Sequence, residues 1–137
     1  MTVTVYGVGS SRSTRKAVQW MSNNQIPFVE RDLLKDPLTV LELQEILQLT
    51  IDGTDDIIAK RSLPYKNMKI DIDELSLLEL LEIVHKEPRL LKSPLIVDKK
   101  KLQAGYNEEE IRQFLPRNTR KFQWLQWKVE HLQPLKG

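Results

Sequence analysis

Residues 2–31 read TVTVYGVGSSRSTRKAVQWMSNNQIPFVER, and this stretch decides the fold. Alternating β-branched residues over 2–6 predict a strand that ends in a glycine-containing turn. Apolar residues at helical spacing predict a helix over about 14–24, and residues 27–31 predict a second short strand. A strand, a helix and a strand within about 30 residues form a parallel βαβ unit.

The middle of the chain is predicted to be helical. Thr39 with Glu42, and Ser76 with Glu79, have capping-box spacing, in which a hydroxyl and a carboxylate each satisfy a backbone N–H at a helix start. The first box precedes a short apolar stripe and the second a leucine-rich run that ends before Pro88. We therefore expect two amphipathic helices between the second and third strands, with a further short helix from Thr54 through Ile57 and Ile58 between them.

Residues 93–98 read SPLIVD, a proline followed by an apolar strand. The lysines at 99–101 form a turn, and residues 102–104 return as the second arm of a β-hairpin. A capping pair then predicts a helix over 107–115, and helical spacing predicts a C-terminal helix over 119–133.

This order of elements predicts an α/β, thioredoxin-like fold with a mixed four-stranded sheet, parallel in its first half and antiparallel in the hairpin. The thioredoxin-like core is discontinuous and comprises residues 1–32 and 91–118. Residues 33–90 form an inserted helical subdomain, and 119–137 form a C-terminal helix or tail. In this fold the proline before the third strand, here Pro94, is cis and faces the active-site loop.

Composition excludes several classes of chemistry. The 137 residues include 21 basic and 19 acidic ones, and a net charge of +2 does not demand nucleic acid as a partner. There is no cysteine, which excludes disulfides, thiol nucleophiles and thiolate metal sites, and two histidines cannot form a histidine metal cluster. No signal peptide and no membrane-length apolar run is present, so we expect a cytoplasmic chain with no membrane partner.

Several stretches resemble the ArsC/Spx family, and the Spx proteins more than the arsenate reductases. They are IPFVER at 26–31, DGTD at 52–55, RS at 61–62 and LQAGYNE at 102–108. The resemblance spans roughly residues 3–122. It implies a bacterial transcriptional regulator, because Spx proteins bind the C-terminal domain of the RNA polymerase α subunit (hereafter the α domain) and redirect transcription during stress.

Three departures from the family pattern bear on the chemistry. The C-x-x-C redox switch of Spx is replaced by Ser11-Arg12-Ser13-Thr14, and a hydroxyl cannot be tuned like a thiol by a helix N-terminus. The reductases have an arginine where this chain has Ser93. The G-R-P turn that follows the fourth strand in the reductases reads Gly105-Tyr106-Asn107 here, which is the Spx form. Of the three oxyanion arginines of the reductases, only Arg61 therefore has a counterpart. We therefore expect no enzyme activity, no cofactor, no metal site and no thiol redox switch.

The resemblance also implies a partner-binding face. Its candidate residues are Ser11, Arg12, Thr14, Asp52, Gly53, Asp55 and Arg61. In Spx the glycine that matches Gly53 lies flat against the α domain, where a side chain would obstruct docking; a glycine here also suits a helix boundary that needs positive φ. With no thiol to sense, we expect Arg61 to pair with an acid. Promoter DNA is a further candidate partner through Lys60, Lys66 and Lys69.

Two other functions remain open. The loop from Ser10 to Lys16 combines hydroxyls and cations at a helix start, so a degenerate ArsC-like protein could bind a small anion there, although simple helix capping by Ser11 or Ser13 explains the same residues. A protein–protein adaptor could instead act through a helix that carries Trp124 and Trp127. As a regulator, the protein would be a constitutive Spx relative or a competitor for the same α surface.

Overall fold

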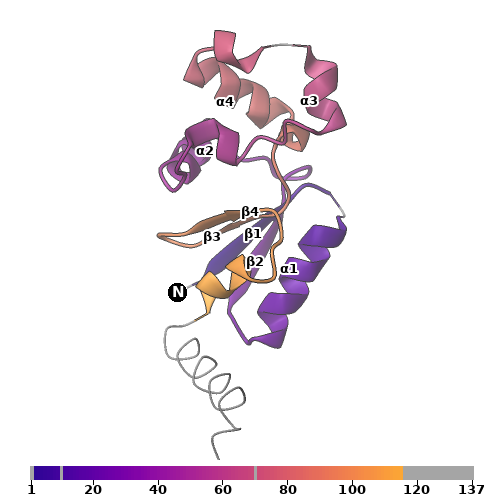
Figure 1. Ribbon diagram of the computed structural model, residues 1–137, viewed down its shortest axis with the longest axis vertical. Coiled ribbons are helices and arrows are strands. Elements are labelled where there is room, and N and C mark those ends of the chain that lie inside the picture. Colours follow the sequence, from indigo (N-terminus) through magenta and orange to yellow (C-terminus); the bar gives the residue numbers. More distant parts are fainter. Residues whose placement is uncertain (1, 10, 70, 116–137) are drawn as a thin grey trace, which may run out of the picture.

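The computed structural model describes residues 2–9, 11–69 and 71–115, and a four-stranded mixed sheet lies at its centre (Figure 1). The strands are β1 (Val3–Gly7), β2 (Phe28–Asp32), β3 (Leu95–Val97) and β4 (Leu102–Ala104), in the order β2-β1-β3-β4. β1 pairs in parallel with β2 and antiparallel with β3, and β3 pairs antiparallel with β4. The predicted sheet, with its parallel first half and antiparallel hairpin, is confirmed.

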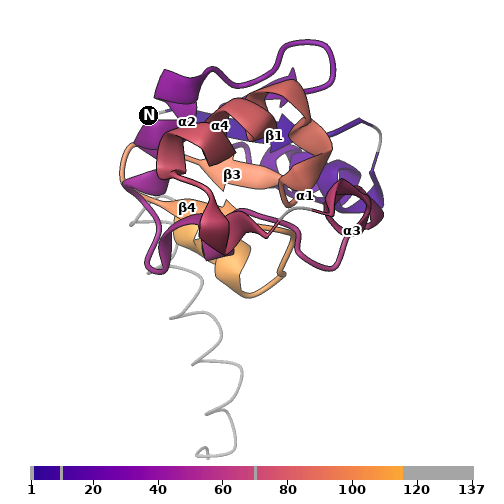
Figure 2. The same cartoon turned by 90° about the horizontal axis from the view of Figure 1, so that it is seen from above.

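Helices cover both faces of this sheet. The α-helices are α1 (Arg12–Asn23), α2 (Val40–Leu47), α3 (Leu63–Met68) and α4 (Leu77–Lys86). The 3-10 helices are η1 (Gly53–Asp56), η2 (Ile72–Glu74), η3 (Pro88–Leu90) and η4 (Glu110–Phe114). α1 and η4 lie on one side of the sheet, and α2 and α4 lie on the other; Figure 2 shows α2 and α4 from above.

The alternation of side chains along the strands divides the core into two clusters. Val5 and Ile96 point toward α1, where Ala17 and Met21 are fully buried. Their neighbour Leu95 points to the opposite face and packs in the cluster formed by α2, α4 and the connecting 3-10 helices. Because successive strand residues face opposite sides, a short central strand supports both clusters at once.

Local capping signals predict the helix starts well. Both capping boxes are confirmed, with Thr39 accepting from the Glu42 N–H and Ser76 from the Glu79 N–H. The predicted start of the first helix is wrong, because Ser11 is the N-cap and α1 begins at Arg12 rather than at residue 14.

Two further differences concern helix type and number. The predicted helix over 107–115 is the 3-10 helix η4, and the sequence did not predict α3, which begins after the cap Ser62. The predicted helix over 119–133 lies outside the described residues. No helix in the described part is long and apolar enough to cross a bilayer.

A bidentate ion pair ties β2 to the start of α2. Arg31 Nη1 and Nη2 donate to Glu42 Oε2 and Oε1, at 2.6 and 3.0 Å, and the backbone N–H of Thr39 donates to the same Oε1. The Arg31 guanidinium also lies 5.8 Å from the centroid of the Tyr6 ring. The hydrogen bond from Arg31 is the main reason why the pKa of Glu42 is lowered to about 2.

Glu42→Gln should lower the free energy of unfolding by about 1 kcal/mol at pH 7. Glutamine retains a side-chain oxygen that can accept from the backbone N–H of Thr39, but it removes the negative charge that pairs with Arg31. Because the pKa of Glu42 is lower in the folded chain than its ordinary value of 4.5, the ionised carboxylate stabilises the fold above pH 4.5. This contribution is lost as the pH falls from 4.5 to about 2. Urea unfolding at pH 7 and pH 3 measures this, and the difference from wild type should shrink at pH 3. Glu45→Gln, one turn later and exposed, is the control; an equal loss there would contradict the assignment.

Candidate partner-binding surface

Three hydroxyl groups join the start of α1 to the segment before β3. Ser11 Oγ lies 2.6 Å from Thr14 Oγ1, and Thr14 Oγ1 lies 3.1 Å from Ser93 Oγ. Ser11 Oγ also accepts from the backbone N–H of Thr14, and Ser93 Oγ accepts from the backbone N–H of Val8. The Ser93–Pro94 peptide bond is cis. We call Ser11, Thr14 and Ser93 the hydroxyl network.

The hydroxyl network is closely packed and internally satisfied. Thr14 is fully buried, and a Cβ added at Gly7 would lie 2.9 Å from its methyl carbon. Within the described residues no buried side-chain nitrogen or oxygen lacks a hydrogen-bond partner. The Ser11 hydroxyl accepts from the backbone N–H of Thr14, and the Thr14 hydroxyl bonds to those of Ser11 and Ser93. The geometry therefore favours helix capping over a hydroxyl-lined anion site. Ser10, the first residue of that proposed site, lies outside the described residues.

The turn between α2 and η1 carries Gly53. The backbone N–H groups of Ile51 and Asp52 both donate to Asp56 Oδ2, at 2.8 and 3.1 Å, so one carboxylate holds the turn. Gly53 has φ +71°, as its position at a helix boundary predicts. A Cβ built on it meets no atom of the chain within 4 Å, so the space beside this glycine is open.

The chain after η1 runs beside the segment before β3. Ile58 and Leu91 form an isolated β-bridge, and the backbone N–H of Lys92 donates to Ile57 O at 2.8 Å. These two segments form an open depression of about 510 Å³. Its polar side chains are Asp55, Lys60, Arg61, Ser62 and Lys92.

The ion pairing in this depression differs from the prediction. Lys60 Nζ lies 2.6 Å from Asp55 Oδ1, and this hydrogen bond raises the pKa of Lys60. Arg61 forms no ion pair in the part of the chain that the structure describes, so the expected acidic partner is not found among those residues. The carboxylate of Asp55, which lines the same depression as Arg61, pairs with Lys60 instead.

The structure brings some of the predicted residues together and leaves others apart. Asp55 and Arg61 line one depression with Lys92, and the next residue, Ser93, bonds to Thr14. The segment before β3 therefore connects the hydroxyl network to the end of η1. Arg12 is exposed on the first turn of α1. Among the described residues, no hydrogen bond or ion pair joins the hydroxyl network directly to Asp52 or Gly53.

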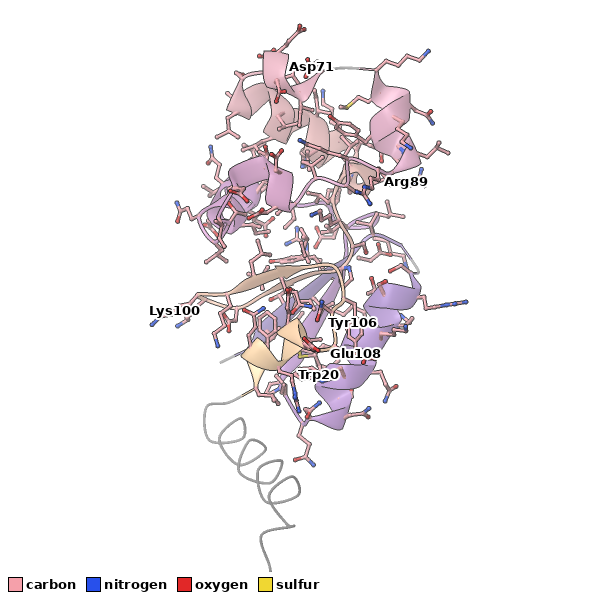
Figure 3. All side chains as sticks on the ribbon, in the orientation of Figure 1. Trp20, Asp71, Arg89, Lys100, Tyr106 and Glu108 are labelled. Carbon is pink, nitrogen blue, oxygen red and sulfur yellow. The ribbon has the colours of Figure 1, made fainter. Side chains whose placement is uncertain are left out.

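The other basic candidates lie on separate elements. Lys66 lies on α3 and Lys69 at its C-cap, and neither lines the depression. Lys100 projects from the tip of the β3–β4 hairpin (Figure 3). Lys92 was not among the predicted candidates, although a cation next to the residue before the cis-proline is visible in the sequence. Trp124 and Trp127 lie outside the described residues.

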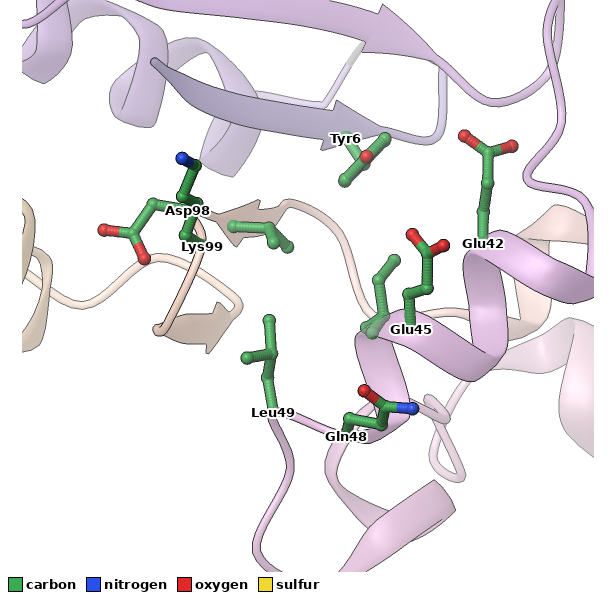
Figure 4. Close-up of a pocket in the computed structure, with 9 residues that line it drawn as sticks. Tyr6, Glu42, Glu45, Gln48, Leu49, Asp98 and Lys99 are labelled. Atoms are coloured by element: carbon green, nitrogen blue, oxygen red, sulfur yellow. The ribbon is translucent and has the colours of Figure 1, made fainter. Parts of the chain in front are cut away.

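A smaller pocket of about 270 Å³ lies between α2 and the hairpin (Figure 4). Tyr6, Glu42, Glu45 and Asp98 contribute to its lining, and burial raises the pKa of the Tyr6 hydroxyl. Glu42 is already engaged by Arg31. In the residues described, no group of histidines and acids could hold a metal ion.

Comparisons with known proteins place these features in a family. The model of the ArsC family matches residues 6–114. "Global transcriptional regulator Spx 2" of Oceanobacillus iheyensis is 54% identical over 130 residues, 95% of this chain and 96% of its own. "Global transcriptional regulator Spx" of Bacillus subtilis is 45% identical over 121 residues, 88% of this chain and 92% of its own.

Solved structures agree with the fold. An ArsC family related protein from Bacteroides fragilis has a TM-score of 0.72 at 21% identity, covering 83% of this chain and 98% of its own. An arsenate reductase from Vibrio cholerae has a TM-score of 0.71 at 20% identity, covering 84% and 96%. At such low identity these likenesses describe the fold alone, whereas the relatives at 45–54% identity are named regulators and not enzymes.

Proposed function

Because this chain belongs to the ArsC family and its relatives at 45–54% identity are named Spx transcriptional regulators, we propose that it is a transcriptional regulator. In this role it binds the RNA polymerase α domain, and the binding does not depend on a thiol switch. The proposed contact residues are Ser11, Arg12, Asp52, Gly53, Asp55 and Arg61, and Thr14, which is fully buried, supports this face from within instead of touching the partner. The segment before β3 connects the start of α1, where Ser11 and Arg12 lie, to the end of η1, where Asp55 lies.

The open turn at Gly53 is the observation that carries the proposal. Its backbone is held by Asp56, its φ is positive, and no atom of the chain lies within 4 Å of a Cβ placed there. A backbone that is held by hydrogen bonds and has open space beside it suits close approach by another protein surface. Asp52 and Asp55 are exposed beside it and would steer the encounter with a basic partner surface.

The hydroxyl network supports independence from thiols. Where Spx proteins have two cysteines, Ser11 and Thr14 share a hydrogen bond of 2.6 Å, and Thr14 extends it to Ser93. This network needs no oxidant to form and connects the start of α1 to the segment before β3. We infer that it holds the loop in the binding conformation at all times, so that the protein acts as a constitutive Spx relative.

Promoter DNA is a second proposed contact. Lys60, Lys66 and Lys69 remain candidates, and the depression adds Arg61 and Lys92. Lys60 is already paired with Asp55, which reduces the charge it can offer to a phosphate. Each phosphate neutralised would add salt-dependent affinity rather than sequence specificity.

The test of the proposal is binding of the purified chain to the α domain in dithiothreitol and in diamide. The chain should bind with the same affinity in both buffers, within about twofold, because it has no cysteine to titrate. The Ser11→Cys/Thr14→Cys double variant is the matched control, and its affinity should differ between the two buffers. Absence of wild-type binding in both buffers would refute the proposed function.

A further inference from the structure

The most exposed large apolar side chain in the described part of the chain is Ile51, at 92% exposure. The next most exposed are Leu63 at 68% and Leu41 at 65%. An isoleucine in contact with water over nearly its whole surface gains free energy when a partner covers it. Single exposed apolar residues are common on protein surfaces, and Ile51 is distinguished by how its backbone is held and by what surrounds it.

The backbone around Ile51 is held on both sides. Before it, the backbone N–H and the hydroxyl of Thr50 both donate to Leu47 O. At Ile51 itself, its N–H and that of Asp52 donate to Asp56 Oδ2. After it, η1 runs into Ile57, which is fully buried. The side chain therefore projects from a preorganised turn, and the backbone loses little conformational entropy when a partner binds there.

The surroundings of Ile51 define the chemistry of its partner. Asp52 follows it directly, is exposed, and makes no ion pair among the described residues. Gly53 comes next, with open space beside it. An apolar side chain followed by an unpaired carboxylate and then by a glycine backbone fits a hollow that is apolar inside and basic at its rim.

We propose that Ile51 is the apolar anchor of this face, inserting into an apolar hollow with a basic rim on the α domain while Asp52 meets that rim. The inference rests on the proposed function and adds to it a residue whose burial contributes binding free energy. Gly53, in contrast, contributes only by having no side chain that would obstruct the partner. A few buried anchors commonly carry most of the affinity of such an interface.

Titration of the α domain with the full chain and its Ile51 variants tests this. Ile51→Ala should weaken binding about tenfold and Ile51→Val about twofold, with unchanged melting temperatures, because the side chain is already 92% exposed in the free protein. The heat-capacity change of binding should become less negative in Ile51→Ala, since less apolar surface is buried. Leu78→Ala, which truncates a side chain 54% exposed on α4, is the matched control and should bind like wild type.

The outcomes separate the inference from the proposed function. If Ile51→Ala binds within twofold of wild type while Gly53→Arg does not bind, the anchor is refuted and the proposed function stands. If wild type does not bind the α domain, both are refuted. If sedimentation shows a dimer of the chain that Ile51→Ala dissociates, the residue serves self-association and the anchor is refuted.

Discussion

Gly53→Arg is expected to weaken binding to the α domain by about a hundredfold or more. The space beside Gly53 is open in the free chain, so the arginine side chain would occupy the room that a docked partner needs. A side chain at φ +71° also strains the backbone, which should cost about 1–2 kcal/mol of stability. Calorimetric titration measures the affinity, and urea unfolding measures the stability.

Gly105→Arg is the matched control for this strain. Gly105 also has a positive φ, +84°, and no atom lies within 4 Å of a Cβ built there, but it follows β4, outside the proposed face. The two variants should lose similar stability, and only Gly53→Arg should lose binding. Equal affinity of Gly53→Arg and wild type would place the partner surface elsewhere.

Thr14→Val is expected to lower the free energy of unfolding by about 1–3 kcal/mol and to weaken binding to the α domain. Valine keeps the shape of the fully buried side chain but removes the oxygen that lies between Ser11 and Ser93. Both remaining hydroxyls are partly buried and lose a partner, and the start of α1 is no longer tied to the segment before β3. Urea unfolding followed by tryptophan fluorescence measures the loss.

The control for Thr14→Val is Ser13→Ala on the same turn of α1. Alanine suits a helix interior, so the free energy of unfolding should change by less than about 0.5 kcal/mol. A Thr14→Val variant as stable as wild type would show that the hydroxyl network does not hold the loop. A variant that is destabilised yet binds the α domain normally would show that the hydroxyl network stabilises the fold but is not needed for partner binding.

Elements with local signals could be predicted from the sequence. Thr39 with Glu42, and Ser76 with Glu79, form capping boxes because each bond joins residues three positions apart. The sheet follows from alternation and from the short turn of the hairpin. The helix α3 has only six residues and no apolar period, so neither its length nor its pattern indicated it.

The geometry of the candidate site depended on contacts distant in sequence. Thr14 and Ser93 are 79 positions apart, and no local pattern predicts that their hydroxyls meet. The same is true of Lys92, which lines the same depression as Arg61 because the chain after η1 runs beside the segment before β3. Among the described residues Asp55 pairs with Lys60 and not with Arg61, and two adjacent cations in a sequence do not reveal which of them an acid will choose.

Calorimetric titration of the full-length chain with the RNA polymerase α domain of its own host tests the central claim most directly. The account predicts saturable one-to-one binding with a dissociation constant that is micromolar or tighter. A titration with no binding up to high micromolar concentrations would contradict it, because the face around Gly53 would then serve a partner other than RNA polymerase.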